Sequence, residues 1–137
     1  MVKSIVIRLN NTPVLWKSQK QKVVSLASSH AEYYALSEAV TEVLPIYGLL
    51  TELKLNFPTP VPIFEDNTGA IELGKNGKFH KNSKHIDVRY HYVNEYVNQK
   101  IIKINKIHKD DQIADLLTKP LGKILFTKFK KLLNLLP

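Results

Sequence analysis

Cysteine is absent from all 137 residues of the sequence. This absence excludes a disulfide framework and a thiolate metal site, so nothing in the composition points to secretion. Long apolar runs are also missing, and the opening "MVKSIVIRLNN" has too few apolar residues before Arg8 for a signal-peptide core or a membrane span. We therefore expect a cytoplasmic or nuclear protein that is not secreted and has no membrane partner.

Acidic residues are scarce relative to basic ones, with 12 Asp and Glu against 20 Lys and Arg, which gives a net charge of +8. Such a surplus favours contact with polyanions such as nucleic acid or an anionic membrane surface. The length suits one compact domain and is too short for two comfortable ones. We expect residues 1–137 to form a single domain.

The order of apolar patterns indicates an α/β protein. Two short runs rich in β-branched and aromatic residues, separated by Asn10 and Asn11, predict a β-hairpin. A helix should begin at about Ser29 and be kinked or broken at Pro45, with a second helical piece after it. The later expected elements are a strand ending before Asp66, a helix entered through Asn67, a helix from Ile86 to Val97, a strand over residues 100–108, a helix over 112–119 capped by Asp110 or Asp111, and an amphipathic helix from Leu121. Together they predict a mixed sheet flanked by helices.

Three acids stand out as candidates for chemistry: Glu32, Asp66 and Asp115. Glu32 lies on the same helical stripe as Leu36 and Val43, so its carboxylate is on the face expected to meet the core. Asp66 follows a strand, and open α/β sheets bind ligands at the carboxyl ends of their strands. A lone carboxylate in apolar surroundings must be paired, protonated or bound to a cation, and Mg²⁺ prefers carboxylate ligands. Glu32 has an alternative interpretation as the acid of a helix capping box.

Four blocks of the sequence resemble, in order, the ribonuclease H domain of copia-type LTR retrotransposon Pol polyproteins. The resemblance runs from about Ser4 to the C-terminus. The blocks are "PVLWKSQKQKVVSLASSHAEYYALSEAVTEVL", "IFEDNTGAIELGKN", "FHKNSKHIDVRYHYVNEYV" and "DDQIADLLTKPL".

This resemblance implies a ribonuclease H-like fold that hydrolyses the RNA strand of RNA/DNA hybrids during reverse transcription. It implies four acids that hold two Mg²⁺ ions, with Mn²⁺ as an alternative ion. Glu32, Asp66 and Asp115 match three of these acids, and for Asp115 the assignment rests on the resemblance alone. The implied partners are the hybrid itself and the reverse transcriptase and integrase regions of the parent polyprotein.

Other positions are implied as contacts with the hybrid or as helpers. Ser28 and Ser29 match positions that contact the hybrid beside the catalytic glutamate. Asn67, next to Asp66, and His108, before the late helix, are auxiliary candidates. The loop over residues 75–84 is either a solvated basic loop or a segment that follows a phosphate backbone, and the resemblance favours the second. The lysines predicted to contact nucleic acid there are Lys78, Lys81 and Lys84.

One part of the family pattern has no match in the sequence. The family's first strand, with its Asp-x-Asp-Trp motif, lies in the centre of the sheet, between the hairpin and the strand that precedes Asp66. Its absence removes one catalytic aspartate and leaves two strand edges to be satisfied. We therefore expect a domain truncated at the N-terminus, with little or no hydrolytic activity. It should also be poorly stable, unless the hairpin pairs directly with the strand before Asp66.

Two further interpretations compete with the enzyme. The chain can be a catalytically inactive remnant that binds nucleic acid or a protein through its basic surface, or a fragment with no separate function. Two local alternatives carry less weight. A zinc site at His85, Asp87 and His91 lacks a further ligand at the right spacing, and the C-terminal amphipathic helix more often docks on its own domain than on a membrane.

Overall fold

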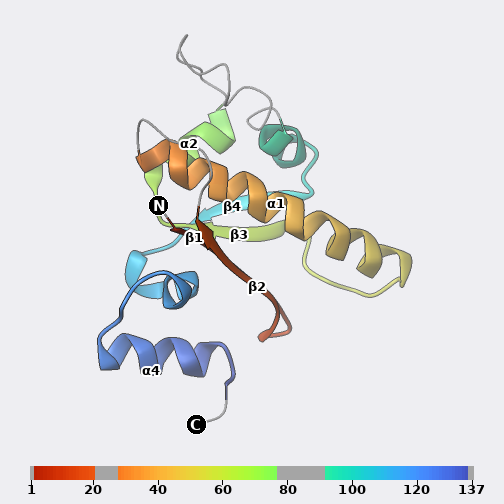
Figure 1. The fold of residues 1–137 in the computed structure, drawn as a ribbon. Coiled ribbons are helices and arrows are strands. Elements are labelled where there is room, and N and C mark those ends of the chain that lie inside the picture. The colour runs from red at the N-terminus through yellow and green to blue at the C-terminus, as the bar shows by residue number, and fades with distance from the viewer. Residues whose placement is uncertain (1, 21–27, 77–91, 136–137) are drawn as a thin grey trace. The chain divides into compact units, whose positions relative to one another are not determined.

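The computed structural model describes residues 2–20, 28–76 and 92–135. Its contacts divide the chain into two compact units. Unit 1 consists of residues 1–24 and 107–137, and unit 2 consists of residues 25–106. The colour bar of Figure 1 follows the chain through both units.

Unit 1 begins with the hairpin that the sequence predicts. Strand β1 (Val2–Leu9) pairs antiparallel with β2 (Thr12–Lys20). The turn consists of Asn10 and Asn11, whose φ angles are 52° and 64°. Asparagine tolerates this left-handed region, and two successive residues of positive φ give the turn whose twist matches a two-residue hairpin. The hairpin prediction is confirmed.

The C-terminal part of unit 1 contains two short 3₁₀ helices and one α-helix. They are η1 (Lys109–Asp111), η2 (Ile113–Leu117) and α4 (Lys123–Leu132). The prediction of the last helix is confirmed, whereas the prediction of an α-helix over 112–119 is wrong. The helix η2 has only five residues before its C-cap Thr118, and Pro120 restricts the backbone just after it. Such a short segment does not propagate an α-helix. The predicted cap of that helix by Asp110 or Asp111 is also wrong, because the N-cap of η2 is Gln112, which makes no side-chain capping bond.

Polar side chains connect the distant parts of unit 1. The Ser4 hydroxyl donates to the Ala114 carbonyl at 2.7 Å, and the Ser18 hydroxyl donates to the Leu117 carbonyl at 3.0 Å. Arg8 donates to the carbonyl of Leu132 at 2.9 Å. These bonds join the hairpin to backbone carbonyls about 100 residues later in the chain. The buried apolar residues of this unit are Ile5, Phe129 and Leu133.

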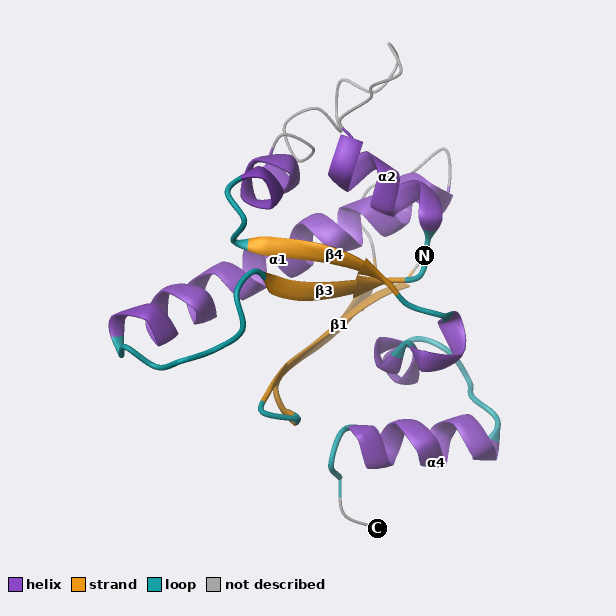
Figure 2. Ribbon diagram, turned by 180° about the vertical axis from the view of Figure 1, so that it is seen from behind, coloured by secondary structure: helices purple, strands orange, loops and turns teal. Residues whose placement is uncertain are grey.

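Unit 2 is built from helices and a parallel pair of strands. Its elements are α1 (Ser28–Glu52), β3 (Val61–Glu65), α2 (Thr68–Asn76), helical residues 92–98 and β4 (Ile102–Lys106). Strands β3 and β4 lie side by side in Figure 2 and are parallel, with Val61 opposite Ile102 and Glu65 opposite Lys106. Parallel strands need a crossover, and α2 and the helical residues 92–98 lie within it.

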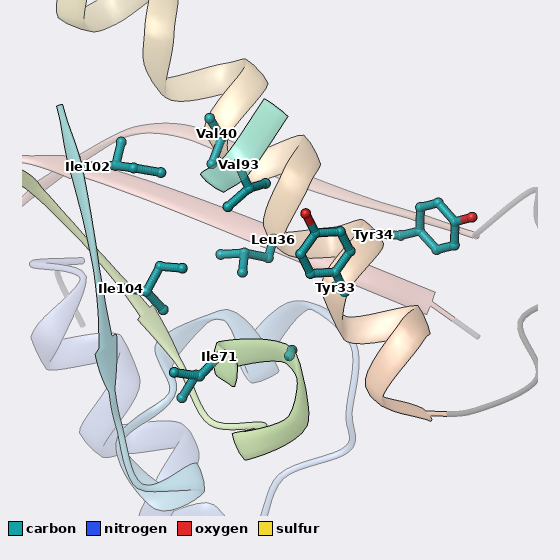
Figure 3. Close-up of a cluster of buried hydrophobic side chains, with 9 residues drawn as sticks. Tyr33, Tyr34, Leu36, Val40, Ile71, Val93, Ile102 and Ile104 are labelled. Atoms are coloured by element: carbon teal, nitrogen blue, oxygen red, sulfur yellow. The ribbon is translucent and has the colours of Figure 1, made fainter. Parts of the chain in front are cut away.

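The core of unit 2 lies between the helices and the strand pair. Figure 3 shows Leu36 and Val40 of α1 near Ile102 and Ile104 of β4. The buried cluster contains Tyr33, Tyr34, Leu36, Val40, Ala70, Ile71, Val93, Ile102 and Ile104. Its members come from three helical segments and β4, so the cluster holds α1 against this strand.

Helix α1 continues through Pro45, so the predicted break is wrong. Val43 and Leu50 are buried on either side of the proline, whereas Pro45 itself is exposed. Proline removes one backbone donor, and this loss is tolerated because packing on both sides holds the helix in place.

The α/β class is confirmed, but the single mixed sheet is not. The described strands form two sheets of two strands each, β1 with β2 and β3 with β4. A direct pairing of the hairpin with β3, the alternative to poor stability, is not among the strand pairs of the described residues. Among the described residues, no helix is long and apolar enough to cross a membrane.

Candidate metal centre

Three carboxylates from two elements meet in unit 2. Each of Glu32, Glu65 and Asp66 offers a carboxylate oxygen, and these oxygens all lie within 4.8 Å of one another. Glu32 lies near the start of α1, Glu65 ends β3, and Asp66 follows it directly. We call these three residues the acid cluster. Helix α1 contributes the first acid because its apolar face packs on the strand pair.

The alternation of strand β3 places Glu65 inside unit 2. Val61, Ile63 and Glu65 share one face of the strand, and Ile63 packs against the core. Pro62 and Phe64 lie on the opposite, exposed face. The side chain of Glu65 therefore follows the apolar face into the interior, where the residue is only 6% exposed.

Glu65 is a buried carboxyl group held by two backbone amides. Its Oε1 accepts the N–H of Asp66 at 3.1 Å and the N–H of Asn67 at 3.0 Å. Burial raises the pKa of Glu65 to about 8, and the nearby carboxylates of Glu32 and Asp66 act in the same direction, while the Asn67 amide opposes them. At neutral pH, without a cation, this group is therefore mainly protonated.

The turn between β3 and α2 is fixed from several sides. Asn67 Oδ1 accepts the N–H of Ala70 at 2.9 Å and so caps α2. The ammonium group of Lys106, at the end of β4, donates to the backbone carbonyl of Asp66 and, at 3.0 Å, to the Thr68 hydroxyl. The backbone at Asp66 is thus held by a carboxylate on its N–H and by an ammonium on its C=O.

The donor set of the acid cluster fits a divalent cation with hard oxygen ligands. Three carboxylates within 4.8 Å repel one another when ionised, and Glu65 relieves this repulsion by holding a proton. A divalent cation would replace that proton and offset the negative charge. Oxygen ligands of this kind suit Mg²⁺ and Mn²⁺.

Two of the three predicted catalytic acids, Glu32 and Asp66, lie together in this cluster. The metal-site role of Glu32 and its alternative as a capping-box acid both stay predictions. Sequence reasoning missed Glu65, although the alternation of β3 could have identified it as an inward-facing acid. It also missed Lys106, whose position opposite Glu65 follows from the parallel register.

The third predicted acid, Asp115, belongs to unit 1. It lies in η2, its side chain is 16% exposed, and its Oδ2 pairs with the Lys119 ammonium at 3.2 Å. His108 is also in unit 1, where its Nδ1 accepts the N–H of Asp110 at 3.1 Å and caps η1. Both residues have local structural partners, and their predicted roles in catalysis stay predictions.

The remaining predicted contacts lie at or beyond the limits of the described residues. Ser28 and Ser29 are the first residues of α1. The lysines at 78, 81 and 84 and the rejected zinc candidates at 85, 87 and 91 lie outside the described residues. The predicted contacts of Ser28, Ser29, Lys78, Lys81 and Lys84 with a nucleic acid stay predictions.

Comparison with known proteins connects the chain to transposon polyproteins. It is 36% identical over 126 residues to the retrovirus-related Pol polyprotein from transposon RE2 of Arabidopsis thaliana. It is 37% identical over 124 residues to that from transposon RE1 of the same plant, and 37% identical over 122 residues to that from transposon TNT 1-94 of Nicotiana tabacum. These alignments cover 92%, 90% and 89% of the chain.

The chain spans 8–9% of the length of these polyproteins. It therefore resembles one segment of a much longer protein, and the predicted resemblance to retrotransposon Pol polyproteins is confirmed at that level. No protein-family model and no solved structure matches the chain. The finer assignment to a ribonuclease H domain stays a prediction.

Proposed function

We propose that the chain is a ribonuclease H-type segment of a copia-type Pol polyprotein. In its complete form this segment hydrolyses the RNA strand of RNA/DNA hybrids with the help of divalent cations. The observation that carries the proposal is the meeting of Glu32 and Asp66, predicted from separate blocks of sequence, within one group of carboxylates. The similarity to Pol polyproteins supports the same assignment.

In this proposal the acid cluster binds the cation. Glu32 and Asp66 are ligands, and Asp115 is a further ligand implied by the resemblance. When bound, Mg²⁺ lowers the pKa of a water molecule and offsets charge on the phosphate. The protein contributes the fixed positions of the carboxylates and, through its net charge of +8, attraction for the nucleic-acid backbone.

The alternative function is binding without hydrolysis. The family pattern includes a fourth acid in an Asp-x-Asp-Trp motif, and the present sequence contains no such motif. The basic charge that favours a hybrid is independent of that acid. A chain with three of the four acids can therefore bind a hybrid and leave it uncut.

Cleavage of a labelled RNA/DNA hybrid in Mg²⁺ or Mn²⁺ tests both functions. The chain is compared with a fusion that supplies a first strand bearing the Asp-x-Asp-Trp motif. Each is also made as Asp66→Asn, and as Glu72→Gln, a control at an exposed acid of the same unit. We expect the fusion and its Glu72→Gln variant to cut, and the fusion with Asp66→Asn to lose at least about 100-fold in rate.

Hybrid binding in EDTA separates the alternatives. Binding without cleavage by both the chain and the folded fusion supports the binding module and contradicts the enzyme. Cleavage by the chain alone that Asp66→Asn abolishes supports the metal site and contradicts the expectation that three acids are too few. Cleavage that survives Asp66→Asn in both proteins contradicts the assigned site.

A further inference from the structure

The junction between β3 and α2 carries polar contacts that neither core packing nor helix capping requires. Glu65 binds the amides of Asp66 and Asn67, and Lys106 binds the carbonyl of Asp66 together with the Thr68 hydroxyl. Glu65 and Lys106 are opposite each other in the parallel register of β3 and β4. A buried carboxyl group and an ammonium group from neighbouring strands therefore hold the backbone of one residue.

We propose that Glu65 and Lys106 are positioning residues that fix Asp66 for cation binding, an inference that rests on the proposed function. They restrain the peptide groups on both sides of the Asp66 Cα atom. The freedom left to Asp66 is then mainly the rotation of its short side chain. A ligand held in this way loses little conformational entropy when it binds a cation.

The contribution of Lys106 runs against simple electrostatics. An ammonium group this close to a cation site repels the cation. If Coulomb repulsion were its only effect, removing the ammonium group should tighten cation binding. A positioning role predicts the opposite change, because an Asp66 backbone that is no longer held presents its carboxylate less often in the binding position. The sign of the change in affinity therefore separates the two roles.

Two substitutions separate the hydrogen-bonding role of Glu65 from its charge. Glutamine keeps a side-chain oxygen that can accept the amides of Asp66 and Asn67, whereas leucine has a similar size and no acceptor. If Glu65 acts by holding these amides, Glu65→Gln keeps their protection and Glu65→Leu loses it. Because Glu65 is 6% exposed, the similar size of leucine avoids leaving a cavity at this buried position.

The experiment combines amide hydrogen exchange with Mn²⁺ binding, followed by paramagnetic broadening of the ¹H–¹⁵N spectrum. The variants are Glu65→Gln, Glu65→Leu and Lys106→Met, with Lys103→Met as a control at an exposed lysine of β4. We expect the Asp66 and Asn67 amides to exchange about tenfold faster in Glu65→Leu and at the wild-type rate in Glu65→Gln. We expect Mn²⁺ to bind about tenfold more weakly to Lys106→Met and with unchanged affinity to Lys103→Met.

Different outcomes overturn the two proposals. Tighter or unchanged Mn²⁺ binding by Lys106→Met, with binding by the wild-type chain intact, overturns the positioning role and leaves the metal site in place. Equal exchange of the Asp66 and Asn67 amides in Glu65→Leu and Glu65→Gln overturns the role of Glu65. If neither the wild-type chain nor the fusion with the first strand binds Mn²⁺, the proposed function itself is overturned.

Discussion

Units 1 and 2 hold their elements together by different means. In unit 2, nine buried apolar side chains from helices and β4 form one cluster. Among the described residues of unit 1, the buried apolar side chains are those of Ile5, Phe129 and Leu133, and they are accompanied by hydrogen bonds from Ser4, Arg8 and Ser18 to distant backbone carbonyls. Burial of an apolar side chain contributes about 1.5–3 kcal/mol, whereas one hydrogen bond contributes about 1 kcal/mol net. We therefore expect unit 2 to be the more resistant to unfolding.

This difference has a functional side. The acid cluster lies in unit 2, next to the apolar cluster, where a packed scaffold can hold three carboxylates at short range. Asp115 and His108 belong to unit 1, where Asp115 lies in the short 3₁₀ helix η2 and pairs with Lys119, and His108 caps η1. Unit 2 is therefore the part of the chain in which packing can hold the acid cluster in fixed positions.

Truncation of the apolar cluster should give the largest effect on stability. Leu36 of α1 is 2% exposed, and Leu36→Ala should lower the free energy of unfolding by about 2–5 kcal/mol. Leu49→Ala, on the same helix at a residue that is 56% exposed, is the control and should cost less than about 1 kcal/mol. Urea denaturation measures both. Equal losses for the two variants would show that the cluster does not carry the stability of unit 2.

Removal of the buried acid should stabilise the protein at neutral pH when EDTA is present. The pKa of Glu65 is about 8 in the folded protein and 4.5 in the unfolded chain. Its contribution to stability is therefore fully present below pH 4.5 and is lost as the pH rises toward 8. Glu65→Gln abolishes this loss and should gain about 3 kcal/mol at pH 7, at about 1.4 kcal/mol per pKa unit.

Urea denaturation between pH 4.5 and 8 checks this prediction, with Glu72→Gln as the control for an exposed acid of the same unit. The gain should grow with pH for Glu65→Gln and stay near zero for Glu72→Gln. A gain that is independent of pH would mean that the buried carboxyl group does not titrate in this range. Addition of Mg²⁺ should reduce the gain, because the cation stabilises the ionised form of the wild-type cluster.

Crowding at the interface between α2 and β4 should have an intermediate effect. A Cβ atom at Gly74 would lie 2.5 Å from Cδ1 of Ile104 and 3.4 Å from Cδ2 of Leu36, so the glycine allows α2 to approach the strand. Gly74→Val should lower the free energy of unfolding by about 1–3 kcal/mol. Gly48→Val is the control, because a Cβ there meets nothing within 4 Å. Thermal unfolding of both variants measures the difference, and an equal loss would show that the helix can shift at no cost.

Loss of a single polar bond in unit 1 should give the smallest effect. Ser4→Ala removes the bond to the Ala114 carbonyl and should cost about 1 kcal/mol, while Ser18→Ala, at an exposed bond, should cost about 0.5 kcal/mol. Hydrogen exchange of amides in β1 and β2 reports the change locally. If either loss matches that of Leu36→Ala, the contrast between the two units is wrong.

The sequence predicts the local elements well where a strong local signal exists. Asn10 and Asn11 provide a turn of positive φ, Asn67 provides a helix cap, and the alternation of β4 fits its burial. The failures occur where distant contacts outweigh local preference. Pro45 signals a helix end, yet the packing of Val43 and Leu50 carries α1 past it. The apolar pattern of residues 112–119 is helical, but the segment is too short to form an α-helix.

The candidate site shows the same division. Glu32 could be recognised as an inward-facing acid from helical periodicity, and Asp66 from its place after a strand. The burial of Glu65 could not be predicted from the sequence, because acids are common at strand ends. Its burial depends on tertiary packing around the end of β3. The contact of Lys106 with the Asp66 carbonyl depends on the parallel register, which no local pattern specifies.

The parallel pairing of β3 and β4 also sets a time order for folding. The hairpin needs only a two-residue turn, and such hairpins form in microseconds. The pairing of β3 with β4 requires the crossover over residues 66–101 to bring the two strands together. Contacts between residues that are distant in sequence form slowly. During synthesis the hairpin can close soon after residue 20 emerges from the ribosome. Asp66 gains its lysine partner only after residue 106 has been made, so the contacts around Asp66 are completed after the hairpin has closed.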